Sequence, residues 1–370
     1  MGKNRVFVTK SVSVSSLGIT SEQIINNLNN GIELAKNDPL FIHPYFKISK
    51  DLPNSDIERA SQIVLYLFSL IEDSLGNNSS IFMATSTGSI FSTEQIYEKI
   101  YNENYSYPLF KKHFFSYIIN NLKNNYKNKI GDFFTFSTAC SSSGHSIMQA
   151  FNFLRHGILK KAIVIGVDTL SLTTMIGFDS LQLISHSGTK PLTKDRDGLS
   201  LGEGGAILML ETDPKDNPVA EVVGVASNSD GYHISSPDPE GKMQKKAILD
   251  SISMANIDKS EIDYISTHGT GTKMNDEVEI KTIKSVFDHN YLVTSLKSFI
   301  GHTLGASSIL EISIVLDMIK QNKIFQNKNF SNSMDETIIP SKTVNKEVKY
   351  FLKNSFGFGG NNVCIVMKTK

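Results

Sequence analysis

The sequence predicts an α/β protein built from two similar halves, and three observations support this prediction. A strand at 133–136, a helix that ends by Gly157 and a second strand at 162–166 form a βαβ unit, which favours a parallel or mixed sheet with helices on its faces. Strands and helices alternate again after a polar stretch at 211–218, which is the best internal boundary. Hydrophobic residues make up 40% of the 370 residues, which allows a large buried core.

The individual elements follow from apolar spacing and turn signals. In the first half, residues 1–212, they are a strand at 5–8, a helix that starts at a capping box of Thr20 and Gln23, a helix within 57–75, a strand at 81–84, peripheral helices within 97–127 and the βαβ unit. In the second half, residues 213–370, they are a strand at 220–225, a helix at 242–254, a strand at 263–266, helices at 276–287 and 305–319, and a last strand at 363–367. Both halves begin with a strand, which indicates a duplicated α/β unit.

The composition excludes several classes of function. Lysine plus arginine (37) equals aspartate plus glutamate (37), so no net charge favours a nucleic acid or a membrane as partner. Two cysteines are too few for a disulfide framework, and no cysteines and histidines stand at zinc spacing, so we expect no metal site. The first ten residues lack the apolar run of a signal peptide, and no apolar stretch approaches the roughly 20 residues of a membrane span. A soluble cytoplasmic protein is therefore expected.

Cys140 is the candidate nucleophile. It lies where the strand at 133–136 turns into a helix, and the small residues at 141–144 leave room for a substrate. The start of a helix offers unpaired N–H groups and a partial positive charge, which predicts a thiol pKa below the usual value of about 8.5. Most lone cysteines are inert core residues, but the flanking pattern favours catalysis here.

Two histidines have a similar setting. His268 follows the strand at 263–266 in a loop of glycine and threonine, and His302 lies in a second loop that begins at Lys297. Such loops at strand ends are where α/β folds place functional side chains. A single histidine is more often structural, but two in this setting favour a catalytic role.

Three charged residues accompany the histidines. Lys297 is either a surface charge or, if it is buried near the cysteine, a source of positive charge that needs an acidic partner. Glu311, in the next helix, is the candidate for that partner. Asp276 lies at the start of the helix after His268, where its charge would complement the helix dipole.

A glycine-rich segment at 354–362 precedes the last strand. Alternating glycine and phenylalanine would let the backbone approach a ligand closely while two rings line an apolar slot. A phosphate-binding loop is rejected because no lysine follows and the segment leads into a strand rather than a helix. Phe356 is also compatible with a core position, whereas Phe358 is the better candidate for facing a ligand.

Five blocks of this sequence, in this order, resemble the elongating β-ketoacyl-acyl-carrier-protein synthases. They are Thr138-Ala139-Cys140, residues 194–198 with Gly202-Glu203-Gly204, residues 267–272, residues 297–302 and residues 354–360. The resemblance runs from about residue 133 to the C-terminus and includes the first strand, but it is poor between about residues 30 and 129. Lys273 replaces a common proline, Asn361 replaces the usual threonine, and the segment before Cys140 is shortened.

The resemblance implies the thiolase-like fold, in which two similar α/β halves form a five-layered αβαβα sandwich. It implies that Cys140 carries the acyl chain as a thioester, and that His268 and His302 bind the malonyl thioester and promote loss of carbon dioxide. It further implies an oxyanion hole from the backbone N–H groups of Cys140 and Phe358, with Phe358 as the gate of the acyl pocket. Thr270 and Thr272 would contact phosphopantetheine, Lys297 and Glu311 would form a supporting charge pair, and Asp276 would support the site.

The implied activity is that of a β-ketoacyl synthase, an acyltransferase. It condenses the acyl group on the cysteine with malonyl-acyl carrier protein, in fatty-acid, polyketide or aryl-polyene chain elongation. No cofactor is expected beyond the phosphopantetheine that carries the substrates. The expected partners are an acyl carrier protein and a second subunit, in a homodimer or in a heterodimer with a related synthase subunit.

Three other functions share parts of this pattern. A coenzyme A-dependent thiolase has the same fold but normally needs a second active-site cysteine, and Cys364 lies inside the last predicted strand. A non-catalytic or regulatory partner subunit typically loses the cysteine, whereas Cys140 and both histidines are present. A cysteine hydrolase with a Cys–His pair would release free acid without condensation.

Overall fold

The computed structural model describes residues 3–30, 35–38, 41–49, 51–53, 57–102, 111–328 and 332–369. Ten of its strands are joined by hydrogen bonds in the order β10-β9-β13-β14-β8-β1-β7-β6-β4-β5. Five belong to the first half: β1 (Val6–Ser15), β4 (Ser79–Ala84), β5 (Ile130–Phe136), β6 (Lys161–Asp168) and β7 (Gly204–Glu211). Five belong to the second: β8 (Ala220–Ser229), β9 (Tyr264–Ser266), β10 (Leu292–Thr294), β13 (Tyr350–Gly357) and β14 (Asn361–Thr369). Two small antiparallel pairs, β2 (Ala35–Asp38) with β3 (Phe41–Phe46) and β11 (Lys323–Ile324) with β12 (Val344–Asn345), complete the described strands.

The two groups of five strands have the same topology. Numbered along the chain within its own half, each group is arranged 3-2-4-5-1 in space. The second strand of each half, β4 or β9, pairs in parallel with both neighbours, and the remaining pairs are antiparallel. Among the described strands, the two groups are joined by the pairing of β1 with β8, over Val6–Val8 and Ala220–Val222. This repeat agrees with the expected duplication, while the boundary between residues 212 and 213 remains a prediction.

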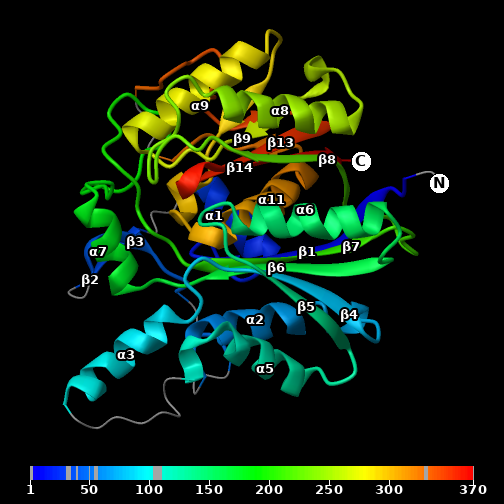
Figure 1. The fold of residues 1–370 in the computed structure, drawn as a ribbon. Helices are drawn as coiled ribbons and strands as arrows, with labels where there is room; N and C mark the ends of the chain where they lie inside the picture. The colour runs from blue at the N-terminus through cyan, green and yellow to red at the C-terminus, as the bar shows by residue number, and fades with distance from the viewer. Residues whose placement is uncertain are drawn as a thin grey trace.

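The helices form three layers around these strands. They are α1 (Ser21–Asn30), α2 (Arg59–Ser69), α3 (Ile90–Tyr101), α5 (Phe115–Asn125), α6 (Ser142–Arg155), α7 (Leu172–Ser180), α8 (Lys242–Ala255), α9 (Lys273–Val286), the single turn α10 (Lys297–Ile300) and α11 (Ser307–Lys320). Figure 1 shows α6 and α11 between the two strand groups, α8 and α9 outside one group, and α2 and α5 outside the other. In α11 only Asp317 and Lys320 are not buried, because strands cover both of its sides. The expected five-layered αβαβα sandwich is therefore confirmed.

Several predicted elements differ from the structure. No strand was predicted for β7 or β13 and no helix for α7, and residues 354–357, predicted as a loop, are the end of β13. Lys353 and Asn354 interrupt the apolar pattern of β13 although both are buried, which explains why that strand was missed. Residues 297–300, also predicted as a loop, form α10. Within the predicted peripheral helices at 97–127, residues 103–110 lie outside the described residues.

The capping box is displaced by one residue from its predicted form. The hydroxyl of Thr20 accepts a hydrogen bond from the Gln23 backbone N–H at 3.3 Å, as predicted. The Gln23 side chain accepts from the N–H of Ile19, at 3.0 Å, instead of that of Thr20. Both bonds still satisfy backbone donors where α1 begins.

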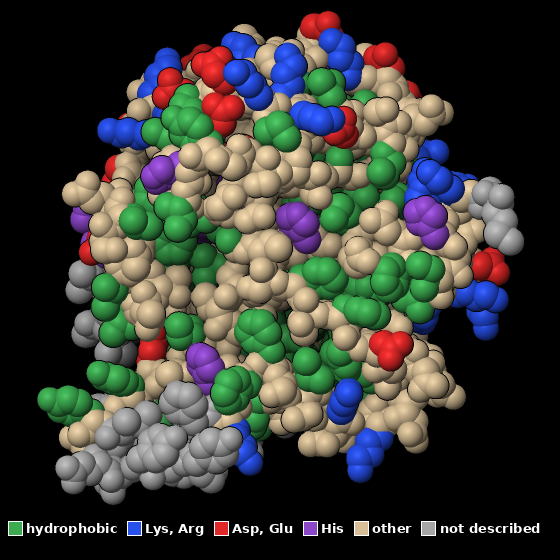
Figure 2. All heavy atoms as spheres, viewed as in Figure 1, with side chains coloured by type: hydrophobic (Ala, Val, Ile, Leu, Met, Phe, Trp, Pro, Cys, Tyr) green, Lys and Arg blue, Asp and Glu red, His purple; other side chains and the backbone are tan. Residues whose placement is uncertain are grey.

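The outer helical layer carries much of the charge on one face. Figure 2 shows side chains of both signs mixed over α8 and α9 at the top of the view, whereas the middle of this face has few charges. No helix within the described ranges has the length and apolar character needed to cross a bilayer.

The carboxylate of Asp168 connects three elements that surround the candidate cysteine. Asp168 ends β6 and is fully buried. It accepts hydrogen bonds from the Thr85 hydroxyl (2.8 Å), from the N–H groups of Ser86 (2.9 Å) and Thr87 (2.9 Å), and from the N–H of Gly305 (2.7 Å). These donors lie in the turn after β4 and just before α11. One buried carboxylate therefore fixes the relative positions of β4, β6 and α11.

Replacing this carboxylate should destabilise the fold. Asp168→Ala leaves several buried donors without an acceptor, and each such loss costs about 1–3 kcal/mol. We expect the free energy of unfolding, measured with a chemical denaturant, to fall by about 3–5 kcal/mol. Asp216→Ala, in the exposed connection between β7 and β8, is the matched control and should change it by less than about 0.5 kcal/mol. Equal effects of the two substitutions would contradict this role of Asp168.

Candidate active site

A strained turn presents Cys140 between β5 and α6. Ala139 has φ of 50°, in the left-handed region that residues other than glycine rarely adopt. The turn is closed by hydrogen bonds from the Ser141 N–H to the Thr138 carbonyl (3.3 Å) and from the Ser142 N–H to the Ala139 carbonyl (3.1 Å). Ser141 caps α6, so Cys140 lies directly before the helix, as the sequence predicts.

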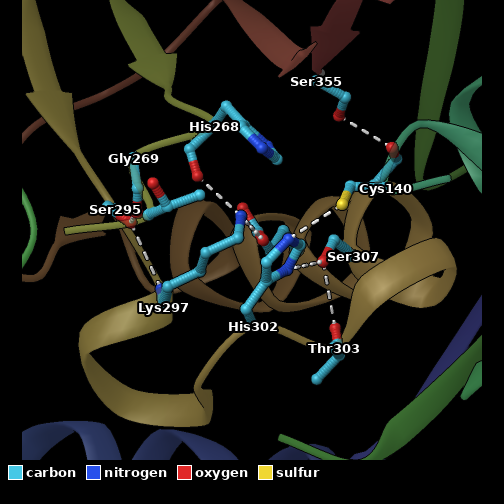
Figure 3. Close-up of polar contacts among 12 residues, drawn as sticks. Cys140, His268, Gly269, Ser295, Lys297, His302, Thr303, Ser307 and Ser355 are labelled. Atoms are coloured by element: carbon cyan, nitrogen blue, oxygen red, sulfur yellow. Dashed lines mark hydrogen bonds and ion pairs between the residues drawn. The ribbon is translucent and has the colours of Figure 1, made fainter. Parts of the chain in front are cut away.

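The structure brings Cys140, His268 and His302 together. His302 Nε2 lies 3.1 Å from Cys140 Sγ, and the two imidazole rings are 5.4 Å apart at 83° to each other. Figure 3 shows both rings close to the cysteine, one from the loop after β9 and the other from the segment after α10. The three side chains are only 2–5% exposed and line one pocket of about 370 Å³. The two halves of the chain therefore build this site jointly, while the catalytic roles of the three residues remain predictions.

The predicted lowering of the Cys140 pKa is wrong. Burial raises the pKa of the thiol to about 11, although Lys297 and the backbone N–H groups of Phe358 and Cys140 act in the opposite direction. Loss of hydration destabilises the thiolate by more than Lys297 and the backbone N–H groups at the helix start stabilise it. Cys140 is therefore a neutral thiol at pH 7, in hydrogen-bond contact with an imidazole.

Both histidines are neutral as well. Burial lowers the pKa of His268 and that of His302 well below 6.5, and the positive charges of Lys297 and Lys353 lower both pKa values further. His302 Nδ1 lies 3.2 Å from the hydroxyl of Ser307, which orients its ring. Two neutral imidazoles, each able to donate one N–H or accept one proton, thus face the same pocket.

Lys297 is buried and paired with Glu311. This agrees with the interpretation of Lys297 as a buried positive charge with an acidic partner, and not with that of a surface charge. Its Nζ donates to the Glu311 carboxylate at 2.6 Å and to the backbone carbonyl of His268 at 2.7 Å, and both ionic side chains are 0% exposed. A second lysine, which sequence reasoning missed, shares this carboxylate. Lys353 Nζ lies 2.5 Å from the other Glu311 oxygen and donates to the Thr267 carbonyl at 2.9 Å.

Two buried carboxylates hold the loop that carries His268. Glu279 accepts hydrogen bonds from the N–H groups of His268 (2.8 Å) and Gly269 (2.9 Å). Asp276 accepts from the N–H groups of Thr270 (3.0 Å) and Gly271 (3.2 Å), so it does more than complement the helix dipole. Sequence reasoning missed Glu279, although it stands three residues after Asp276 and hence on the same face of α9.

The glycine-rich segment is the turn of a hairpin between β13 and β14. Phe358 is half-buried and lines the pocket, with its ring 5.5 Å from that of Phe178. A Cβ added at Gly357 would lie 3.3 Å from the Cys140 nitrogen, so this hairpin packs closely against the turn at the cysteine. The N–H groups of Phe358 and Cys140 both lower the pKa of the Cys140 thiol, so both lie close to the sulfur, while their role as an oxyanion hole remains a prediction.

The two threonines predicted to contact pantetheine lie along the same pocket. Thr270 and Thr272 both line it, and their hydroxyl oxygens are 2.9 Å apart. Phe356 also lines the pocket and is buried, with its ring 6.4 Å from that of His268. Both interpretations of Phe356, as a core residue and as part of the apolar wall, therefore apply.

Comparison with known proteins identifies the family. The β-ketoacyl synthase N-terminal domain model matches residues 69–215, and the C-terminal domain model matches residues 219–331. The chain is similar to 3-oxoacyl-acyl-carrier-protein synthase 2 of Mycobacterium leprae, 30% identical over 245 residues that cover 62% of this chain and 58% of that protein. It is also similar to 3-oxoacyl-acyl-carrier-protein synthase 1 of Buchnera aphidicola subsp. Schizaphis graminum, 32% identical over 257 residues that cover 64% of this chain and 61% of that protein. The chain thus spans about three fifths of the length of these curated relatives.

Solved structures extend the comparison to the whole chain. A ketosynthase in complex with its chain length factor from Xenorhabdus doucetiae matches with a TM-score of 0.88 and 27% identity, over 99% of this chain and 98% of that chain. A β-ketoacyl synthase from Burkholderia phymatum matches with a TM-score of 0.90 and 23% identity, over 99% of this chain and 100% of that chain, which shows the shared fold. The two domain models together match more than half of the residues, and the chain belongs to the β-ketoacyl synthase family.

Proposed function

We propose that this protein is a β-ketoacyl synthase that condenses a cysteine-bound acyl group with a malonyl unit on an acyl carrier protein. One observation carries the proposal: Cys140 Sγ lies 3.1 Å from His302 Nε2, with His268 beside both in one pocket. A thiol, two neutral imidazoles and two backbone N–H groups are the groups that acyl transfer and decarboxylation need.

In the first step, the Cys140 sulfur attacks the thioester of the incoming acyl carrier. Its raised pKa means that it must lose its proton as it attacks, and His302 Nε2 is placed to accept that proton. The N–H groups of Cys140 and Phe358 stabilise the oxyanion of the tetrahedral intermediate. The carrier thiolate then leaves and takes up the proton, so that His302 is neutral again and Cys140 holds the acyl chain as a thioester.

In the second step, the malonyl carrier enters the same pocket. Neutral His268 and His302 donate N–H hydrogen bonds to the malonyl thioester carbonyl, where negative charge develops as carbon dioxide departs. The tautomer of His302 changes between the two steps, so that Nε2 now carries the proton and Nδ1 accepts a hydrogen bond from the Ser307 hydroxyl. One such donor can contribute about 3 kcal/mol to lowering the barrier. The resulting carbanion attacks the carbonyl carbon of the Cys140 thioester, which releases the Cys140 thiolate and leaves a β-ketoacyl chain on the carrier. The thiolate then takes up one proton from water and returns to the neutral thiol.

The substrates of this reaction are carried on phosphopantetheine in our proposal. Thr270 and Thr272 line the pocket that leads to Cys140 and offer hydroxyl groups to the pantetheine amides. The curated relatives are named as 3-oxoacyl-acyl-carrier-protein synthases, which supports a carrier-bound substrate. Fatty-acid, polyketide and aryl-polyene elongation all use this chemistry, and a cytoplasmic location remains a prediction.

The alternative functions have less support from the site. Cys364, which a thiolase would need near the nucleophile, is fully buried in β14 with its sulfur 3.4 Å from the side-chain oxygen of Asn354. It is absent from the described residues that line the pocket. A non-catalytic subunit would have no need for the contact between Cys140 and His302. A cysteine hydrolase would be recognised by release of free acid in the assay below.

The open edge of the sheet supports a second subunit. β5 is the last strand of its group, and among the described strands it pairs only with β4. None of its residues is buried, although it carries Phe133, Phe134 and Phe136. An apolar edge strand of seven residues is a template for pairing with another chain. We therefore propose a homodimer through β5, with a related synthase subunit as the alternative partner, since one similar structure is a ketosynthase with its chain length factor.

The central test separates acyl transfer from decarboxylation. Incubation with acyl- and malonyl-carrier thioesters should give a β-ketoacyl carrier, detected by mass spectrometry, and an acyl adduct on the wild-type protein. Cys140→Ala should lose the adduct and the product. His268→Ala should keep the adduct but lose at least about 100-fold in product formation, because a donor to the developing enolate is missing. An acylated Cys140→Ala protein, or free acid as the main product, would refute the assignment.

The raised pKa of Cys140 predicts how the free thiol reacts. Alkylation of the free protein by iodoacetamide should rise about tenfold per pH unit and should still be rising at pH 9, because the pKa lies near 11. Cys140→Ser is the control, since buried Cys364 should not react in the folded protein. A plateau of the rate below pH 8 would show that the thiolate is stabilised in the free protein after all.

The dimer proposal predicts the mass of the isolated chain in solution. Light scattering at micromolar concentration should give twice the mass of one chain. Phe133→Lys and Phe134→Lys together place two charges on the β5 edge and should shift the protein towards the monomer, because a paired edge would have to bury those charges. A chain that is monomeric without these substitutions would contradict the homodimer and favour a different second subunit.

A further inference from the structure

Lys353 is a buried ionic group for which the condensation chemistry gives no role. It lies in the middle of β13, opposite Ser266 of β9, and is 1% exposed. A lysine in a central strand is costly unless it is paired, since burial of an ammonium without partners is strongly unfavourable. Its two partners, the Glu311 carboxylate and the Thr267 carbonyl, both adjoin the loop of His268.

We propose that Lys353 is a positioning residue for malonyl decarboxylation, which holds the strand end before His268 and keeps both active-site imidazoles neutral. This inference rests on the function proposed above. Lys353 holds the carbonyl of Thr267, and Lys297 holds the carbonyl of His268, so two ammonium groups fix two consecutive peptide units. Glu279 holds the N–H groups of the same loop from the other side.

The net charge around this loop depends on Lys353. Lys297 and Lys353 face Glu311, and Glu279 is the second carboxylate that acts on Lys353. Burial raises the pKa of Glu279 to about 7, so at pH 6 its carboxyl is mostly neutral, and Lys297, Lys353 and Glu311 together carry one positive charge. Without Lys353 this positive charge is lost, and the loss of a nearby positive charge favours a protonated imidazole.

Groups from every neighbouring element contribute to this balance. Burial is the largest influence that lowers the pKa values of His268 and His302, followed by Lys297, and Lys353 adds to both. The pKa of Lys353 itself is lowered to about 8 by burial, so it is mostly charged at pH 7 and below. Its influence therefore falls on the acid side of the pH profile.

The ionisable groups that surround the two imidazoles are Cys140 before α6, Asp168 on β6, Asp276 and Glu279 on α9, Lys297 on α10, Glu311 on α11, Lys353 on β13 and Cys364 on β14.

Neutral imidazoles matter because of what an imidazolium would do. A neutral imidazole N–H donates a hydrogen bond to the enolate and is a far weaker acid than an imidazolium, so it transfers its proton to carbon much less readily. An imidazolium would give its proton to the carbanion, which forms an acetyl carrier and leaves no nucleophile for condensation. Protonated His302 would also be unable to accept the thiol proton of Cys140. Lys353 therefore protects the yield of condensation as the pH falls.

The test compares pH profiles of three variants with the wild type. Lys353→Met keeps the length of the side chain without its charge, and Lys353→Arg keeps the charge. Lys349→Met, just before β13, removes an exposed lysine that pairs with Glu261, and it serves as the matched control. The rate of malonyl-carrier decarboxylation and the ratio of acetyl to β-ketoacyl carrier are measured from pH 5.5 to 8.5, with the unfolding temperature as a check on folding.

On the acid side of the profile, we expect the pH of half-maximal decarboxylation rate to be about one unit higher for Lys353→Met than for the wild type. Below that pH, the decarboxylation rate of the variant should be about tenfold lower. The fraction of acetyl carrier should rise in the same range. Lys353→Arg should restore most of the wild-type profile, and Lys349→Met should not change it. A Lys353→Met profile that is lower at every pH but unshifted, or an equal shift in Lys353→Arg, would overturn the proposal.

A second measurement does not depend on activity. Nitrogen NMR of wild-type protein with labelled histidine, assigned by the signal lost in His268→Gln, should show a neutral His268 imidazole at pH 6. Titration of His268 near pH 6.5 would refute the proposal even in an active enzyme. A wild-type protein that never decarboxylates malonyl carrier would instead refute the proposed function, and the NMR result would still report the state of His268.

Discussion

The site depends on one buried carboxylate, that of Glu311, which binds two ammonium groups in a region closed to water. Each pair alone would gain little over its cost of dehydration. Together, however, Lys297 and Lys353 use their remaining hydrogen bonds on the carbonyls of Thr267 and His268. The ion cluster thereby fixes the backbone that carries His268, at the boundary between α10, α11 and β13. The position of His268 in the pocket follows from this cluster more than from any contact of its own ring, since His268 Nδ1 has no hydrogen-bond partner in the described part of the chain.

The same exclusion of water explains the protonation states at the site. Burial favours the neutral form of a thiol and of an imidazole alike, so Cys140, His268 and His302 all rest uncharged. A site of neutral groups beside fixed N–H donors has its greatest effect when charge appears during reaction, because the donors are already oriented. The strained turn at Ala139 and the close packing of Gly357 hold these donors in place.

The sequence was sufficient for the fold class and for the cysteine, the two histidines and the two threonines of the pocket, but not for the interior that supports them. Cys140, His268 and His302 could be found because each follows a strand with small residues around it, a local signal. Lys353 could not, because an ammonium within a buried strand contradicts the apolar pattern by which such strands are recognised. The pKa of Cys140 was mispredicted for a related reason: helix starts are visible in a sequence, whereas the depth of burial depends on β13 and β14, which arrive more than 200 residues later.

The duplicated topology explains why the cysteine and His302 meet. In each half, the third strand leads into the helix of the central layer: β5 into α6 and β10, by way of α10, into α11. Cys140 stands at the start of α6, and His302 shortly before the start of α11, so the two residues occupy corresponding places in the two halves. β1 pairs with β8, and the two strand groups lie on opposite sides of the layer that holds α6 and α11. The starts of these two helices therefore lie close together. The repeat of one α/β unit thus places a thiol at one helix start within 3.1 Å of an imidazole that lies just before the equivalent helix.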